Sequence, residues 1–214
     1  MLNIITACIR PKNLPKIQDS ILTSVAKYEM PIAISWHIIL DGLYKNDDLE
    51  EIIFKQQLPF KTEIPTFLWT NDTYKTKWEG PITVGLSKIT EGLVCIIDDD
   101  NIMHPHFIKG IYPRYLAGAY KGFIFHQQLS RDKNCNNRVR IAKITNLKPC
   151  SVDTAQFCFD RSIINANAKW SWDSKTPDAA FIEAVYRKHA DSIQFVDEIL
   201  CYYNYLSTSK NLFD

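Results

Sequence analysis

The stretch Leu93-Val94-Cys95-Ile96-Ile97-Asp98-Asp99-Asp100-Asn101 joins an apolar run directly to three carboxylates and an amide. Three of its five apolar residues are β-branched, which is typical of a buried strand in a parallel sheet. Because an unpaired buried charge is costly, the aspartates are expected at the mouth of a site where a cation or a ligand compensates them. Strand alternation predicts that Asp98 and Asp100 point to one side and Asp99 to the other. A solvated acidic turn is the alternative, and the apolar strand before it favours a metal or nucleotide site.

The residues before this stretch alternate between strand and helix patterns. Strands are expected at residues 2–8, 32–40 and 66–70, and helices at 14–25, 47–56 and 80–89, with a polar loop at 71–79. Asn13 is expected to cap the first helix. This alternation is the signature of a doubly wound sheet, which binds ligands at the carboxyl ends of its strands.

The second half of the chain has a less regular pattern. We expect a helix at residues 105–120, strands at 122–129, 152–159 and 194–203, a polar loop or hairpin at 131–150, and a polar turn at 170–175. Thr176-Pro177-Asp178 predicts a helix start, with a cap, a proline and an acid in the first turn. The buried stripe of that helix is predicted to comprise Phe181, Ile182, Val185 and Tyr186. No repeat or linker appears, so a single domain over 1–214 is expected.

Composition excludes several classes of protein. The chain has 214 residues, 46% hydrophobic and 23% charged, with a net charge of +1. This charge gives no electrostatic case for a nucleic-acid partner, and no apolar run has the ~20 residues of a membrane span. The six cysteines lack paired metal-ligand spacing, and Cys8, Cys95 and Cys158 are expected to be reduced core residues. With no signal-peptide pattern at the start, a cytoplasmic protein is expected.

Three groups of carboxylates carry the predicted chemistry. Only seven glycines occur, and neither GxGxxG nor GxxxxGK[ST] is present, so a nucleotide must be held through a metal and side chains. Asp100 with Asp98 suits Mg²⁺ or Mn²⁺, which prefer oxygen ligands. Asp41 ends the second strand at the same edge; it either accepts a hydrogen bond from a base or sugar, or ends a turn with Gly42. Asp178 either stabilises a helix N-terminus or takes a proton from an acceptor hydroxyl.

Together these motifs resemble the GT-A glycosyltransferases, which use nucleotide-sugar donors. Ile4-Ile5-Thr6-Ala7-Cys8-Ile9-Arg10-Pro11 is similar to the family 2 first strand and its nucleotide-contacting end, which implies roles for Thr6 and Arg10. Trp36-His37-Ile38-Ile39-Leu40-Asp41 is similar to the second strand, whose final Asp binds uracil. Ile96-Ile97-Asp98-Asp99-Asp100-Asn101 resembles the DxD motif, in which the last Asp holds the metal and the earlier ones contact ribose.

Two features also resemble the β-glucuronyltransferases. Asp99-Asp100-Asn101 is similar to their DDDN motif, and Asp153-Thr154-Ala155-Gln156-Phe157 to their DxAxF strand on the acceptor side. Pro177-Asp178-Ala179-Ala180-Phe181 falls where these families place the catalytic base.

The sequence departs from the family pattern at two places. The usual arginine-asparagine pair before DxD is absent from Gly80-Pro81-Ile82-Thr83-Val84-Gly85, and we assign the missing positive charge to Lys77. Asn204 stands where a histidine often completes the metal shell.

The resemblance implies a GT-A fold, with a nucleotide-binding lobe at 1–101 and an acceptor-side lobe at 102–214. It implies a metal-dependent, inverting glycosyltransferase of the hexosyltransferase type that uses a UDP-sugar. The acceptor is a glycan, a lipid-linked molecule or a protein. Two alternatives stay open: a nucleotidyltransferase, which normally has a glycine-rich first loop, and a non-catalytic module that binds a nucleotide sugar or a cation.

Overall fold

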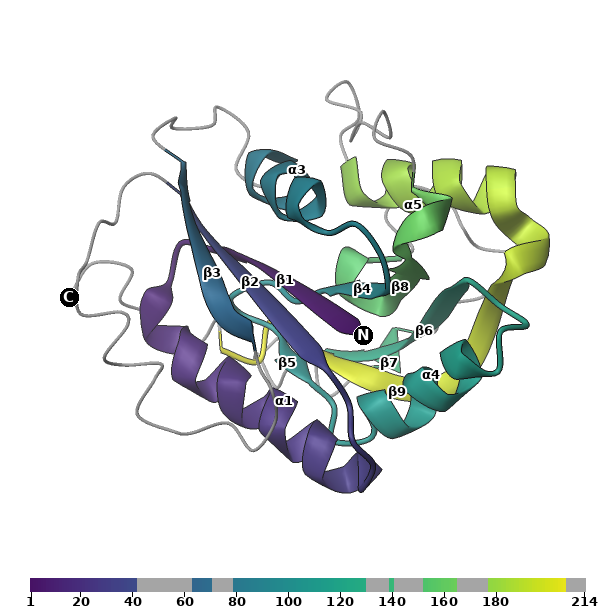
Figure 1. The fold of residues 1–214 in the computed structure, drawn as a ribbon, viewed down its shortest axis with the longest axis horizontal. Coiled ribbons are helices and arrows are strands. Elements are labelled where there is room, and N and C mark those ends of the chain that lie inside the picture. Colours follow the sequence, from purple (N-terminus) through teal and green to yellow (C-terminus); the bar gives the residue numbers. More distant parts are fainter. Residues whose placement is uncertain (42–62, 71–78, 130–138, 141–151, 165–176, 207–214) are drawn as a thin grey trace.

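A computed structural model describes residues 1–41, 63–70, 79–129, 139–140, 152–164 and 177–206 (Figure 1). In chain order the elements are β1 (Leu2–Cys8), η1 (Pro11–Asn13), α1 (Leu14–Tyr28), β2 (Ile34–Asp41), β3 (Glu63–Thr70), α3 (Glu79–Lys88), β4 (Leu93–Ile96), β5 (Ile102–Met103), α4 (Phe107–Leu116), β6 (Gly122–Leu129), β7 (Val139–Arg140), η3 (Thr154–Gln156), β8 (Phe157–Asp160), η4 (Arg161–Ile163), α5 (Pro177–His189), η5 (Ala190–Ser192) and β9 (Ile193–Tyr203). The chain is therefore an α/β protein, as predicted.

Within these ranges nine strands form one sheet. Eight follow the order β3-β2-β1-β4-β8-β6-β9-β5, and β7 pairs with β6. The strands β3, β2, β1 and β4 are parallel to one another, whereas β8 runs antiparallel to β4 and β6. The chain moves outward from β1 to β2 and β3 and then returns to the other side of β1 as β4. At such a switch point the carboxyl ends of two neighbouring strands border a crevice, where open α/β sheets bind ligands.

Helices cover both faces of the sheet (Figure 1). Alternate residues of β1 divide between two cores: Leu2, Ile4 and Cys8 face α1 and α4, whereas Ile5 and Ala7 face α3 and α5. Burial on both faces explains why β4 reads as a continuous apolar run and why β1 has only two polar residues, Asn3 and Thr6. No helix in the described ranges has the length and apolar character needed to cross a membrane.

A glycine allows α3 to approach the sheet closely. A Cβ atom on Gly85 would lie 2.8 Å from Cγ2 of Ile5 and 3.2 Å from Cδ1 of Ile39, both fully buried. Any side chain at this position would push α3 away from β1 and β2. Because Ile82 on the same helix lines the cavity described below, Gly85 helps to position one wall of that cavity.

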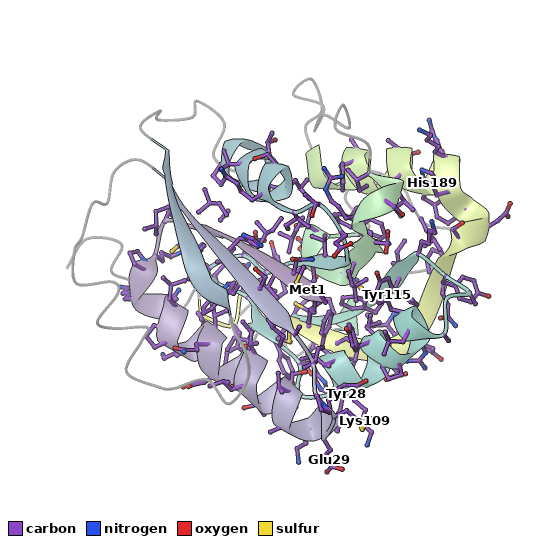
Figure 2. All side chains as sticks on the ribbon, in the orientation of Figure 1. Met1, Tyr28, Glu29, Lys109, Tyr115 and His189 are labelled. Carbon is purple, nitrogen blue, oxygen red and sulfur yellow. The ribbon has the colours of Figure 1, made fainter. Side chains whose placement is uncertain are left out.

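Tyr115, labelled on α4 in Figure 2, ties this helix to the end of β8. Its hydroxyl donates a hydrogen bond to Asp160 at 2.6 Å, and the Ser162 backbone N–H donates another at 2.8 Å. Burial alone raises the pKa of Asp160, but the hydrogen bonds from Ser162 and Tyr115 outweigh it and lower the pKa below the ordinary value.

The predicted elements mostly match the observed ones. The strands at 2–8 and 122–129 have the predicted bounds, and the helix predicted at 105–120 covers Phe107–Leu116. The predicted stripe on α5 is confirmed, because Phe181, Ile182 and Val185 are buried and Tyr186 packs against the same core. The helix predicted at 47–56, the loop at 71–78, most of the segment 131–150 and the turn at 170–175 lie outside the described residues.

Two local predictions are wrong. The segment starting at Asp153 begins with the 3-10 helix η3 before the strand, because Asp153 accepts the N–H of Ala155 at 2.9 Å and the Gln156 side chain accepts the N–H of Asp153 at 3.2 Å. Asn13 holds the N-cap position of α1 without a capping bond. Its Nδ2 instead donates to the carbonyl of Asp99 at 2.8 Å.

The cysteines of the described segments form no disulfide. Cys8, Cys95, Cys158 and Cys201 are free and buried, as predicted for the first three. Burial raises the pKa of Cys8, Cys95 and Cys158, which keeps these thiols protonated and unreactive.

Candidate functional site

Asp99 is a buried anchor for the loop that follows β1. Its side chain has no exposed surface, and it accepts the backbone N–H groups of Ile9 at 2.7 Å and Arg10 at 2.6 Å. Burial raises the pKa of Asp99, while the Arg10 guanidinium and the Ile9 N–H oppose that rise. The carboxyl ends of β1 and β4 are neighbours in the sheet, which brings this loop and Asp99 together.

Arg10 bridges two of the three aspartates. Its Nε lies 2.9 Å and its Nη2 2.7 Å from Oδ1 of Asp99, and Nη2 also lies 2.9 Å from Oδ2 of Asp100. Arg10 therefore compensates the charge of the buried carboxylate and contacts a second one that is partly exposed.

Asn101 joins the aspartate turn to the C-terminal end of β9. The Asn101 N–H donates to the carbonyl of Asp98 at 3.0 Å, which closes a turn over residues 98–101. The buried Asn101 side chain donates to Oδ2 of Asp98 at 3.3 Å and accepts the N–H of Asn204 at 2.9 Å. A further backbone bond of 3.0 Å runs from Leu206 to Asp100. Asn204 has a φ of 51°, a left-handed conformation that asparagine tolerates better than most residues.

Asp98 and Asp100 line one cavity of about 130 Å³. The rest of its lining is formed by Ile82, Asp153, Thr154, Tyr203 and Asn204. The alternation predicted for the three aspartates is thus observed, with Asp99 buried on one side and the other two at the cavity. The cavity draws residues from α3, the β4 end, the η3 start and the β9 end, so it lies at the carboxyl end of β4, one of the two strands that border the switch point.

The donor set fits a hard divalent cation. Mg²⁺ and Mn²⁺ are commonly held by one or two carboxylates, with substrate phosphate oxygens and water completing the shell. Asp98 and Asp100 supply two carboxylates on one cavity, and Asn204 also lines it. Asp153 is a third acidic residue on the same cavity, although no cluster of three or more His, Cys, Asp or Glu residues suited to a metal occurs in the described segments.

The other predicted site residues have different surroundings. The Thr6 hydroxyl is fully buried and accepts a hydrogen bond from the Trp36 indole at 3.0 Å, so it joins β1 to β2; a nucleotide contact from Thr6 stays a prediction. Asp41 ends β2 and Asp178 is the second residue of α5, but their side chains lie outside the described part of the chain. Lys77 lies outside it entirely.

Sequence reasoning missed the structural roles of Asn101 and Asp153. Asn101 was part of a motif, but its partner Asn204 is 103 residues away and no local pattern signals that bond. The spacing of Asp153 and Gln156 is that of a capping box, and this signal was available in the sequence.

A sheet of this order, with helices on both faces and a carboxylate turn at its switch point, is the GT-A fold of the nucleotide-diphospho-sugar transferases. Staphylococcus aureus TarS has a TM-score of 0.63 and 12% identity over 94% of this chain, and a shorter TarS structure in complex with UDP-GlcNAc has a TM-score of 0.59 and 15% identity. The mannosyltransferase PcManGT from Pyrobaculum calidifontis, in complex with GDP-Man and Mn²⁺, has a TM-score of 0.62 and 9% identity over 99% of this chain.

These likenesses establish the fold. The chain spans 36% of the first TarS structure, 57% of the one with UDP-GlcNAc and 58% of PcManGT. No protein-family model and no curated protein matches the sequence.

Proposed function

We propose that this chain is a glycosyltransferase domain that transfers a sugar from a nucleoside diphosphate sugar, with UDP as the nucleotide, to an acceptor hydroxyl with inversion. The observation that carries the proposal is the pair of carboxylates Asp98 and Asp100 on one cavity at the carboxyl end of β4. Proteins of the same fold in complex with UDP-GlcNAc, or with GDP-Man and Mn²⁺, support it.

Each polar residue has a separate role in the proposed reaction. Asp98 and Asp100 hold Mn²⁺ or Mg²⁺, which when bound neutralises negative charge on the leaving diphosphate. Asp41 accepts a hydrogen bond from the uracil ring. Asp178 accepts the proton of the acceptor hydroxyl as that oxygen attacks the anomeric carbon from the face opposite the diphosphate.

The metal assignment is tested by calorimetry of UDP with and without Mn²⁺. Asp100→Ala should abolish the Mn²⁺-dependent part of UDP binding and leave the fold intact, because Asp100 lies at the cavity edge and Arg10 keeps its bonds to buried Asp99. Asp191→Ala removes an exposed carboxylate in η5 and serves as the matched control. Equal UDP affinity in wild type and Asp100→Ala with Mn²⁺ present would show that the metal assignment is wrong.

The catalytic assignment is tested separately with Asp178→Asn. Asparagine keeps an oxygen near the N-terminus of α5, so the free energy of unfolding should fall by at most ~1 kcal/mol. It cannot accept a proton, so transfer should slow by ~10²–10⁴ while donor affinity stays unchanged. The assay measures UDP release from UDP-sugars with and without candidate acceptors. A wild-type protein that binds the donor with Mn²⁺ but never releases UDP would instead be a binding module.

A further inference from the structure

We propose that Arg10 is a latch on the metal-binding carboxylate: it neutralises Asp100 while no metal is bound, and with metal and donor present it releases Asp100 and turns Nη2 toward the donor diphosphate. This inference rests on the proposed function. It gives Arg10 the cationic role at the diphosphate that the sequence pattern assigned to Lys77.

The two carboxylates that Arg10 contacts differ in their access to solvent. The Asp99 side chain is 0% exposed and the Asp100 side chain 14% exposed, and Asp100 alone of the two lines the cavity. A fully buried carboxylate needs a counter-charge at all times. Asp100 has room for another cation at the cavity, so its bond to Arg10 is the exchangeable one.

The guanidinium is arranged so that one bond can break while another stays. Nε donates to Asp99 only, whereas Nη2 is shared between Oδ1 of Asp99 and Oδ2 of Asp100. The Arg10 backbone is held independently, because its N–H and that of Ile9 both donate to Oδ2 of Asp99. When Asp100 is released, the loop and the Nε bond therefore remain in place.

The freed Nη2 would lie beside the cavity where Asp98 and Asp100 are proposed to hold the metal that the donor diphosphate contacts. An arginine suits this position because the N–H groups of its planar guanidinium can bind a carboxylate and a phosphate oxygen at the same time. A lysine ammonium acts only as a point charge. Arg10 thus contributes the same charge in two places, first against Asp100 and then against the diphosphate.

Arg10→Lys tests the latch because it keeps the charge and removes the fork. Free Mn²⁺ is followed by electron paramagnetic resonance, and UDP binding in saturating Mn²⁺ by calorimetry. The single ammonium of lysine stays with buried Asp99, so Asp100 is released. Mn²⁺ alone should then bind about 10-fold tighter, which is the lower end of what one charge-assisted hydrogen bond contributes. UDP should bind about 10-fold weaker because its diphosphate loses a partner.

Arg114→Lys is the matched control. Arg114 pairs with Glu198 at 2.8 Å on a half-exposed surface, so the same chemical change there should move neither constant. Opposite shifts at Arg10 support the latch, because a residue that only supports the loop would weaken both ligands together. Unchanged or weaker Mn²⁺ binding by Arg10→Lys overturns it, and unchanged UDP binding overturns the diphosphate contact.

Wild-type protein provides a second measurement if Arg10→Lys does not fold. In guanidinium NMR spectra recorded during titration with diamagnetic Mg²⁺ and UDP, the Arg10 Nη signals should shift and the Nε signal should stay nearly unchanged. Static Nη signals in a protein that binds both ligands overturn the latch alone. A wild-type protein that binds neither Mn²⁺ nor UDP overturns the proposed function itself, and the latch with it.

Discussion

Replacing Asp99 by asparagine should destabilise the fold more than it weakens the nucleotide site. Asp99 accepts two backbone N–H groups at 2.6 and 2.7 Å and pairs with the Arg10 guanidinium. The asparagine amide keeps one acceptor oxygen but places an NH₂ group against donors. Arg10 also loses the partner that holds it most closely. The sequence resemblance assigns Asp99 to the ribose, whereas its contacts describe a structural anchor.

The size of the effect follows from burial. Asp99 has no exposed side-chain surface and Arg10 only 16%, so the pair belongs to the buried class. Breaking a buried ion pair by removing one partner costs about 3–5 kcal/mol. For a chain of this length each kcal/mol corresponds to a melting-temperature shift of ~2–4 °C, so Asp99→Asn should melt roughly 6–20 °C lower.

The assay compares urea unfolding and calorimetric UDP binding for Asp99→Asn and Asp100→Asn. Asp100 is partly exposed at the cavity, so its variant should unfold at a urea concentration close to that of the wild type and lose metal-dependent binding instead. An Asp99→Asn protein with the wild-type unfolding midpoint and a large loss of UDP affinity would refute the anchor and restore the ribose contact.

Two further predictions concern elements around the site. Tyr115→Phe should lower the free energy of unfolding by about 1 kcal/mol at pH 7, because it removes a partly exposed hydrogen bond to a charged group. The pKa of Asp160 in the folded protein lies below its ordinary value of ~3.9. This stability is therefore present above that value and is lost as pH falls through the folded pKa. Urea titrations should show a smaller difference between wild type and Tyr115→Phe at pH 2.5 than at pH 7. Gly85→Ala should cost about 1–3 kcal/mol by overpacking against Ile5 and should weaken UDP by displacing α3; unchanged melting and binding would contradict the close packing.

The sequence was sufficient to predict the fold class and the orientation of the aspartates, because both follow from local periodicity. The run of apolar residues at 93–97 identified a strand buried on both faces, and alternation separated Asp99 from Asp98 and Asp100. The start of α5 could be predicted equally well, since proline is favoured at the first position of a helix.

Long-range partnerships could not be predicted in the same way. Arg10 contacts Asp99 across 89 residues, and Asn13 bonds to the carbonyl of Asp99 instead of capping its own helix. A capping residue and a tertiary donor have the same local sequence, and only the arrangement of β1 beside β4 decides between them. The roles of Asp41, Lys77 and Asp178 remain predictions from the resemblance.

The bond from Asn204 to Asn101 also has a consequence for how the protein is made. It joins residues 103 positions apart, and the neighbouring bond from Leu206 to Asp100 spans a similar length of chain. The parallel strands β1, β2, β3 and β4 are all complete on the ribosome long before β9 emerges. The aspartate turn therefore acquires these supports only after residues 204 and 206 have been synthesised, and contacts of such high sequence separation form slowly. A nascent chain would carry the acidic turn for more than a hundred residues of elongation before this arrangement could close around a ligand.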